Sequence, residues 1–207
     1  VNKILTNKIK EITPNIPIVS EESTNHKEDV DLKNFWLIDP IDGTRDYINN
    51  RDEFTLNAAL ILEKKPAIGI ITAPAKKRVF YSYGVSHSYE LIDNQEISLM
   101  SKKKNTIGYT AVSYSNKLIP EILKIHKKYK INSFQKMKSS LKFCVIAAGE
   151  FDMYVAEPRA CEWDIAAGHA ILEHSGGKVT DFNYDEILYG KLEFKNPSLI
   201  LKSKNIL

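Results

Sequence analysis

The fold of this 207-residue chain is decided by the stretch Trp36-Leu37-Ile38-Asp39-Pro40-Ile41-Asp42-Gly43-Thr44. The apolar residues Phe35–Ile38 predict a buried strand, and Pro40 is expected to end it because proline cannot donate to a sheet ladder. Asp39 and Asp42 then lie at the strand's end and in the turn after it. Positions of this kind collect ligands in layered α/β proteins.

Asp39 and Asp42 bring two carboxylates so close together that they repel each other unless a positive charge lies between them. Mg²⁺ takes oxygen ligands and keeps several waters, so it fits such a pair. The alternative is a turn in which both aspartates only cap backbone N–H groups. For the Asp39–Gly43 run alone, the two interpretations are equally good.

Two other segments supply carboxylates at the ends of predicted elements. Glu21 and Glu22 follow a short β-branched strand at Pro17–Ser20, and Asp164 opens a helix whose small residues permit close packing. A helix start suits an anion or a metal-bound phosphate because free N–H groups point outward there. Taken singly, the two glutamates are typical of a solvated surface pair and Asp164 of a helix N-cap.

Three blocks in this order form a specific pattern: Val19–Glu22, Asp39–Thr44, and Trp163–Gly168 with Ser175-Gly176-Gly177 after it. In these blocks the chain resembles the lithium-sensitive, magnesium-dependent phosphatases of the inositol monophosphatase superfamily. Within that superfamily it is most similar to the bacterial 3′(2′),5′-bisphosphate nucleotidases. The runs Glu53–Asn57 and Ser139–Cys144 favour this branch.

The resemblance implies a mixed α/β (α+β) fold, a five-layered αβαβα sandwich that lacks part of its first helical layer. Residues 1–100 would form an N-terminal half with Glu21 and the aspartate motif. Residues 106–207 would form a C-terminal half with the Trp-Asp motif, and both halves would build one compact catalytic unit. Asp39, Asp42 and Asp164 are expected to converge in space.

The resemblance also implies two or three Mg²⁺ ions and a set of site residues. The implied metal ligands are Glu21, Asp39, the Ile41 carbonyl, Asp42 and Asp164. The implied catalytic residues are Glu21, Asp42 and Thr44, with the Thr44 hydroxyl orienting the attacking water. The implied substrate-binding residues are Glu21, Ile41, Asp42, Gly43, Thr44, Ser140, Lys142 and Asp164.

The implied activity is Mg²⁺-dependent removal of the 3′-phosphate from adenosine 3′,5′-bisphosphate. The alternatives are an inositol monophosphatase-like sugar phosphatase and a truncated, inactive remnant that still binds metal or nucleotide. The implied partner is a small phosphorylated nucleotide. A nucleic acid polymer is not expected, because the net charge is only +3 and the lysines at Lys102–Lys104 and Lys127-Lys128 lack interleaved aromatics.

The chain departs from the family pattern at two places. It starts at Val1, and Ile4, Leu5, Ile9 and Ile12 at helical spacing resemble only the tail of the family's second helix. We therefore expect a fragment or degraded copy that self-associates or pairs with a separately encoded N-terminal segment. Lys138 stands where the family has glycine, which affects the fit of a nucleotide there.

No apolar run approaches the ~20 residues that span a membrane, and the resemblance implies a cytoplasmic protein or one peripheral to the inner membrane. The remaining pattern predicts a meander of strands at 54–62, 66–73, 78–83 and 89–92, with a connector at Lys102–Asn105. Further strands are expected at 109–114, 131–137, 152–155, 178–180 and 198–201, and helices at 118–128, 139–149 and 163–174. Two side chains carry open alternatives. Arg159 is either a surface residue or a nucleotide contact, and His169 is expected to pack rather than bind metal.

Overall fold

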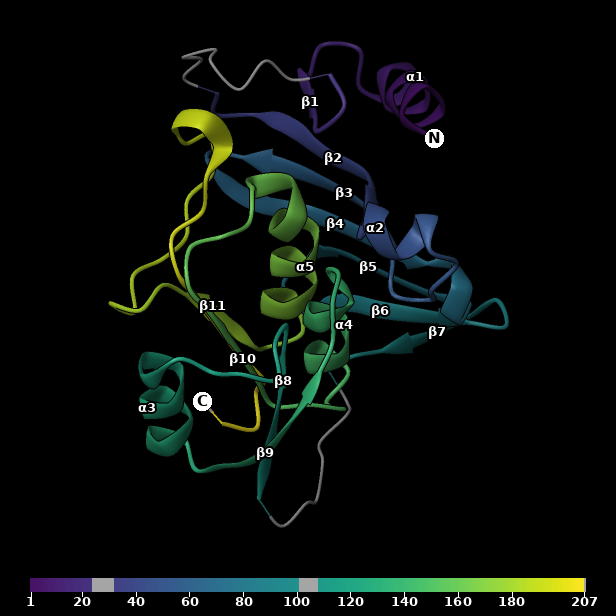
Figure 1. Ribbon diagram of the computed structural model, residues 1–207. Coiled ribbons are helices and arrows are strands. Elements are labelled where there is room, and N and C mark those ends of the chain that lie inside the picture. The colour runs from purple at the N-terminus through teal and green to yellow at the C-terminus, as the bar shows by residue number, and fades with distance from the viewer. Residues whose placement is uncertain (24–31, 101–107, 207) are drawn as a thin grey trace.

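The computed structural model describes residues 1–23, 32–100 and 108–206, which form two β-sheets with helices between and outside them (Figure 1). Sheet A contains β1 (Ile18–Ser20), β2 (Phe35–Asp42), β3 (Thr55–Leu62), β4 (Lys65–Ala73), β5 (Arg78–Gly84), β6 (His87–Ile92) and β7 (Gln95–Ser98), side by side in that order. β1 runs parallel to β2 and the later strands are antiparallel, so the predicted meander is confirmed.

Sheet B contains the strands that follow in the sequence. Their spatial order is β11 (Lys178–Thr180), β12 (Leu199–Lys202), β10 (Met153–Ala156), β8 (Tyr109–Ser113) and β9 (Ile131–Lys136). The helices are α1 (Asn2–Ile12), α2 (Thr44–Ile48), α3 (Pro120–Lys128), α4 (Leu141–Ala147) and α5 (Glu162–His174), with 3₁₀ turns at Pro74–Lys76 and Leu192–Phe194. The expected connector at Lys102–Asn105 lies outside the described residues.

Side-chain alternation along the strands produces the layers. In β2, Phe35 and Leu37 join the main core with α4 and α5, whereas Trp36 and Ile38 face the other way and pack near Ile9 of α1. Strands of sheet B alternate in the same manner between α5 and α3. The order is therefore α1, sheet A, α4 with α5, sheet B, α3, which is the expected αβαβα sandwich (Figure 1).

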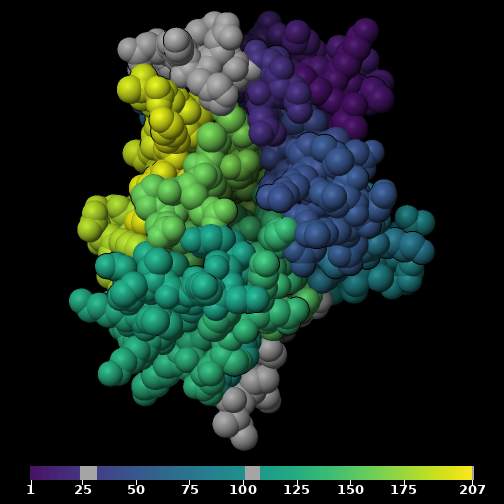
Figure 2. Space-filling model, viewed as in Figure 1, coloured from purple at the N-terminus to yellow at the C-terminus, as the bar shows by residue number. Residues whose placement is uncertain are grey.

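The outer face of sheet A, which contacts α1 at β2, extends across the later strands of the sheet. Ile70, Tyr81 and Tyr89 pair across β4, β5 and β6 on the same side of the sheet as the α1 contact. Nearby, Tyr83 is 54% exposed and stacks on Tyr89 with ring centroids 5.9 Å apart. On the face shown in Figure 2, segments from the first half of the chain (purple to blue) meet those of the second half (green to yellow) along one boundary.

The expectation that Pro40 ends the strand is wrong. β2 continues to Asp42, and its ladder with β3 shifts between the pairs Asp39–Asn57 and Asp42–Thr55. Between these two pairs β2 advances by three residues and β3 by two, so β2 contains one extra residue, a β-bulge. Proline is tolerated at a bulge because no ladder partner requires its missing N–H there.

Most other elements lie within two residues of their predicted bounds. α3 starts at Pro120 rather than Leu118 because proline suits the first helical position. α4 spans only Leu141–Ala147, and the expected turn after β4 is a 3₁₀ turn. α2 and β7 were not predicted, although the two-residue Asp93-Asn94 turn before β7 is a recognisable hairpin signal.

Candidate active site

Three carboxylates meet where the end of β2 approaches the first turn of α5. Asp39 and Asp42 come from β2 and Asp164 comes from α5. One carboxylate oxygen of each lies within 4.8 Å of the others. The predicted convergence is therefore confirmed, whereas the role of these residues as metal ligands stays a prediction.

Backbone N–H groups hold one oxygen of Asp39 and one of Asp164. The Ile41 N–H donates to Asp39 Oδ1 at 3.0 Å across the bulge, as the capping alternative predicted for this turn. The Cys161 N–H donates to Asp164 Oδ2 at 2.7 Å. Cys161 is the N-cap of α5, so Asp164 is not the N-cap but the third helical residue, which bonds back to it.

Asp42 is held from the opposite side of the site. Its Oδ2 atom accepts hydrogen bonds from the Ser140 N–H, from the Ser140 hydroxyl at 2.6 Å and from the Thr55 hydroxyl at 3.3 Å. Among the described residues, no hydrogen bond is recorded to the other oxygen, Oδ1. One oxygen of each of the three carboxylates is thus held by donors of the protein, and Asp39 additionally interacts with the carboxyl group of Glu21.

Burial makes these negative charges costly in the absence of a cation. Burial, followed by repulsion from Asp42, raises the pKa of Asp39 from 3.8 to about 9. The same two causes raise the pKa of Asp164 from 3.8 to about 7. A hard divalent cation would offset both effects, and carboxylate oxygens are the ligands that it prefers. The residues present therefore fit a magnesium-type site.

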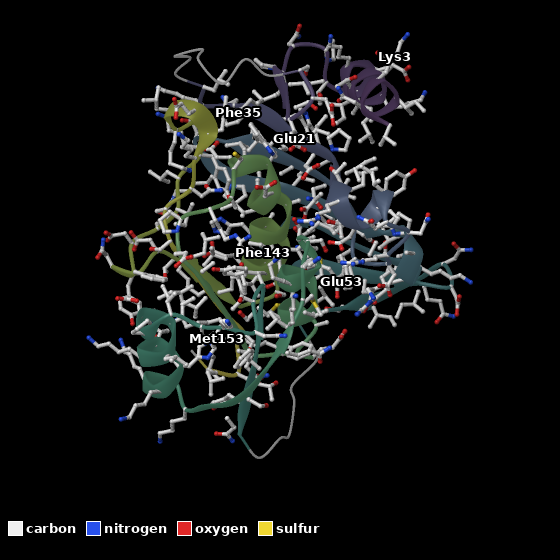
Figure 3. The ribbon with its side chains drawn as sticks, in the orientation of Figure 1. Lys3, Glu21, Phe35, Glu53, Phe143 and Met153 are labelled. Carbon is white, nitrogen blue, oxygen red and sulfur yellow. The ribbon has the colours of Figure 1, made fainter. Side chains whose placement is uncertain are left out.

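Glu21 approaches this cluster from β1. It follows the strand in a turn, its N–H donates to the Ile38 carbonyl at 3.1 Å, and its carboxylate interacts with that of Asp39. Figure 3 places Glu21 beside the start of α5. Both glutamates are exposed, but only Glu21 acts electrostatically on the carboxylates of Asp39 and Asp164.

The predicted residues that follow Asp39 line the bulge and the start of α2. The Thr44 hydroxyl donates to the Ile41 carbonyl at 2.9 Å, which ties the predicted water-orienting group to the predicted carbonyl ligand. Gly43 has φ +85°, and a Cβ there would lie 2.7 Å from the Glu53 carbonyl. Glycine is therefore required at this position by both conformation and space.

A pocket of about 300 Å³ opens beside the carboxylates. Its lining includes Asp42 and Asp164 together with three cations, Lys138, Lys142 and Arg159. The Arg159 guanidinium lies 3.5 Å from the centre of the Tyr114 ring. The pocket therefore joins a site for a cation to a group of side chains that attract an anion.

The two lysines of the pocket are held in different ways. Lys142 is half-buried, donates to the Ser139 carbonyl and lies 5.2 Å from the Tyr154 ring centre, and desolvation lowers its pKa. Lys138 donates to both oxygens of the buried Asp46 at 2.9 Å. Its charge is therefore directed to α2, and Lys138 stands at the edge of the pocket.

Sequence reasoning missed the polar residues behind the carboxylates. Thr55 donates to Asp42, the buried Asn57 donates to the Ser140 hydroxyl at 2.9 Å, and Glu53 accepts from the Lys138 N–H. The signal that could have found them is polar residues at alternate positions of a strand that is otherwise buried. His169 is buried as expected and bonds to the Tyr189 hydroxyl at 2.9 Å.

Comparison with known proteins agrees with this geometry. Residues 1–205 match the profile of the inositol monophosphatase family. The chain is 35% identical over 206 residues to the 3′(2′),5′-bisphosphate nucleotidase CysQ of Buchnera aphidicola, and this match covers 94% of the chain and 74% of the relative. It is 31% identical to the CysQ of Aggregatibacter actinomycetemcomitans, covering 97% and 77%.

Solved structures show the same fold. The crystal structure of CysQ from Bacteroides thetaiotaomicron, a bacterial member of the inositol monophosphatase family, has a TM-score of 0.78 and 29% sequence identity. The match covers 96% of this chain and 82% of that one. An inositol monophosphatase of Thermotoga maritima has a TM-score of 0.73 at 24% identity, covering 99% and 76%, and supports the fold alone.

Fold, site and relatives together define the class of the protein, which is that of the layered α/β phosphatases. The chain belongs to the inositol monophosphatase family. That family is generally metal-dependent, in agreement with the three-carboxylate cluster. Among the described residues, no helix has the length and apolar character needed to cross a membrane.

Proposed function

We propose that this phosphatase is Mg²⁺-dependent and removes the 3′-phosphate of adenosine 3′,5′-bisphosphate, giving AMP and phosphate. The observation that carries the proposal is the arrangement of the pocket. Three converging carboxylates, each held through one oxygen, lie beside a pocket whose lining includes three cations. A substrate with two phosphates fits both parts, because one phosphate would lie at the cation site and the other at the basic side chains.

The residues that would hold Mg²⁺ are Asp39, Asp42 and Asp164, with Glu21 and the Ile41 carbonyl as further ligands. A bound divalent cation would polarise the phosphoryl group and lower the pKa of an attacking water. Because the family resemblance implies two or three ions, Asp42, which lies between Asp39 and the pocket, would be shared between them.

The protein's own side chains would bind and orient the substrate. Lys142 and Arg159 would attract the second phosphate, and the Tyr114 ring under Arg159 keeps that guanidinium in place. Partial burial of Lys142 reduces competition from water, which strengthens its attraction for a phosphate. Thr44, fixed by its bond to Ile41, and Glu21, at the rim of the cluster, would orient the water that attacks.

The choice between bisphosphate nucleotides and inositol phosphates depends on the pocket cations and the relatives. An inositol monophosphate carries one phosphate and would leave Lys142 and Arg159 without a partner. The relatives at 31% and 35% identity are named as 3′(2′),5′-bisphosphate nucleotidases. Both observations support the nucleotide as the substrate.

The test is phosphate release from adenosine 3′,5′-bisphosphate and from inositol 1-phosphate, with Mg²⁺ or with EDTA. We expect kcat/KM to be about tenfold to hundredfold higher for the bisphosphate, the gain of one charge-assisted contact. Asp42→Asn should lower the Mg²⁺-dependent rate by roughly a thousandfold or more. The matched control is Asp93→Asn in the exposed β6–β7 turn, which should leave the rate unchanged.

Three results would contradict the proposal. A higher kcat/KM for inositol 1-phosphate would mean that the substrate is a sugar phosphate and not a bisphosphate nucleotide. Equal rates with Mg²⁺ and EDTA would exclude the cation requirement. No release from either substrate by the folded protein would support an inactive remnant.

A further inference from the structure

A chain of buried polar side chains lies behind Asp42 and connects β2 and β3 of sheet A to the starts of α4 and α5. Asn57, on β3, is 1% exposed, and Ser140, just before α4, is 2% exposed. The Asn57 side-chain amide donates to the Ser140 hydroxyl at 2.9 Å. That hydroxyl lies 2.6 Å from Asp42 Oδ2 and 2.6 Å from the Asp164 carbonyl oxygen.

The direction of the Ser140 proton follows from its neighbours. A hydroxyl has one proton to donate and two lone pairs that accept. The Asn57 amide occupies one lone pair, so the proton must point away from Asn57. The two acceptors on that side are the carboxylate of Asp42 and the carbonyl of Asp164.

We infer that Asn57 and Ser140 are positioning residues that fix Asp42, and with it Asp164, in the geometry required for cation binding. The inference rests on the proposed cation site and adds two residues to it. Ser140 then acts through Asp42 and not on the substrate, in contrast to the substrate-binding role that the family resemblance implies. Asn57 acts through Ser140.

The site gains two properties from this arrangement. Asp42 Oδ2 is occupied by the Ser140 hydroxyl and N–H, so Oδ1 is presented to the cation in one rotamer. The same hydroxyl lies 2.6 Å from both Asp42 Oδ2 and the Asp164 carbonyl oxygen, so its single proton bonds to one of two carboxylate-bearing elements and Ser140 contacts both. Loss of outer partners of this kind typically weakens metal affinity about tenfold to hundredfold.

The experiment compares direct cation binding with kinetics in Asn57→Ala, Ser140→Ala, Ser140→Thr and the double alanine variant. Mn²⁺ binding to the purified protein, followed by electron paramagnetic resonance, gives the affinity without turnover. We expect each alanine variant to bind Mn²⁺ about tenfold to hundredfold more weakly. The threonine variant keeps the hydroxyl and should remain within about threefold of the wild type.

Two further readouts separate positioning from stability. Ser88 is a matched control because it is buried and its hydroxyl also donates to a carbonyl of α5, Ile171, at 2.8 Å, away from the carboxylates. Ser88→Ala should lower the melting temperature as Ser140→Ala does but leave Mn²⁺ affinity unchanged. The double variant should bind Mn²⁺ as weakly as Ser140→Ala alone, because Asn57 acts through Ser140.

Steady-state kinetics test the alternative, in which Ser140 contacts the substrate directly. At saturating Mg²⁺, KM of Ser140→Ala for the bisphosphate should stay within about twofold of the wild type. A raised KM with unchanged Mn²⁺ affinity would make Ser140 a substrate contact and overturn the inference, as would additive effects in the double variant. A wild-type protein that binds no Mn²⁺ would overturn the proposed cation site itself.

Discussion

Asp39 is the residue at which burial and charge oppose each other most strongly. Its side chain is 1% exposed, and burial together with repulsion from Asp42 and Glu21 raises its pKa from 3.8 to about 9. Without a cation, the folded protein therefore keeps a proton that the unfolded chain releases. The contribution of Asp39 to the free energy of unfolding is therefore fully present below about pH 4 and is lost as the pH rises toward about 9.

We expect Asp39→Asn to stabilise the cation-free protein. The amide keeps an oxygen for the Ile41 N–H and is neutral without taking up a proton on folding, so at about pH 8 in EDTA the free energy of unfolding should rise by about 1–3 kcal/mol. With Mg²⁺ the wild type should regain this difference. Urea unfolding between about pH 5 and pH 9 measures both, and a gain that is the same with EDTA and Mg²⁺ would contradict the assignment.

Arg159 tests the basic part of the pocket. Its guanidinium lies over the Tyr114 ring and lines the pocket beside Lys142. Arg159→Ala should raise KM for adenosine 3′,5′-bisphosphate about tenfold to hundredfold, because a hydrogen bond to a charged group contributes about 1.5–3 kcal/mol. For p-nitrophenyl phosphate, which has one phosphate, KM should not change. Equal increases for both substrates would place Arg159 at the shared phosphate.

The close contact between α5 and β4 sets the position of Asp164. A Cβ on Gly69 would lie 2.2 Å from the Ala167 carbonyl oxygen and 2.9 Å from the Ala170 Cβ. Gly69→Ala should therefore push α5 away from sheet A, cost about 1–3 kcal/mol of stability and weaken cation binding. The small residues of α5 predicted this packing, but not that Gly69 is their partner.

The control for Gly69→Ala is a glycine of the same sheet with open space around it. A Cβ on Gly84 would meet nothing within 4 Å, although its φ of +150° makes any side chain strained. Gly84→Ala can therefore lower stability but should leave Mn²⁺ affinity unchanged. If Gly69→Ala loses stability and keeps its Mn²⁺ affinity, the position of α5 does not control the site.

Elements were predictable where the pattern was local and periodic. The continuous apolar run Phe35–Ile38 predicted the strand but not its length, because the bulge at Pro40 depends on the register with β3. α2 has only five residues and is too short to produce a recognisable period. Its start follows instead from Gly43, whose left-handed conformation and close approach to the Glu53 carbonyl exclude a side chain.

The site was predictable in proportion to how much of it is contiguous in sequence. Asp39 and Asp42 could be paired from their spacing alone. Asp164 was indicated by the sequence as a carboxylate at a helix start, but its place in the same site came through the family resemblance, since no local pattern indicates which helix start meets which strand end. The hydrogen bond between Asn57 and Ser140 could not be predicted from the sequence, because it joins β3 to the start of α4 across the whole fold.

At the scale of the whole molecule, the proposed cation site joins segments from both halves of the chain. Asp39 and Asp42 belong to sheet A, whereas Asp164 lies on α5, which follows β10 of sheet B. Mg²⁺ should therefore stabilise the protein as a unit. At a hundredfold excess over its Kd, a ligand that binds only the folded state adds about 2.7 kcal/mol.

We expect Mg²⁺ to raise the melting temperature and to slow hydrogen exchange both at the end of β2 and at the start of α5. In Asp164→Asn, which removes the ligand of the second half, both effects should be largely lost, because the remaining carboxylates lie on one sheet. NaCl at matched ionic strength is the control, since screening acts on all surface charges alike. Equal stabilisation of the wild type and Asp164→Asn by Mg²⁺ would mean that the cation binds elsewhere and that the halves are joined by the core alone.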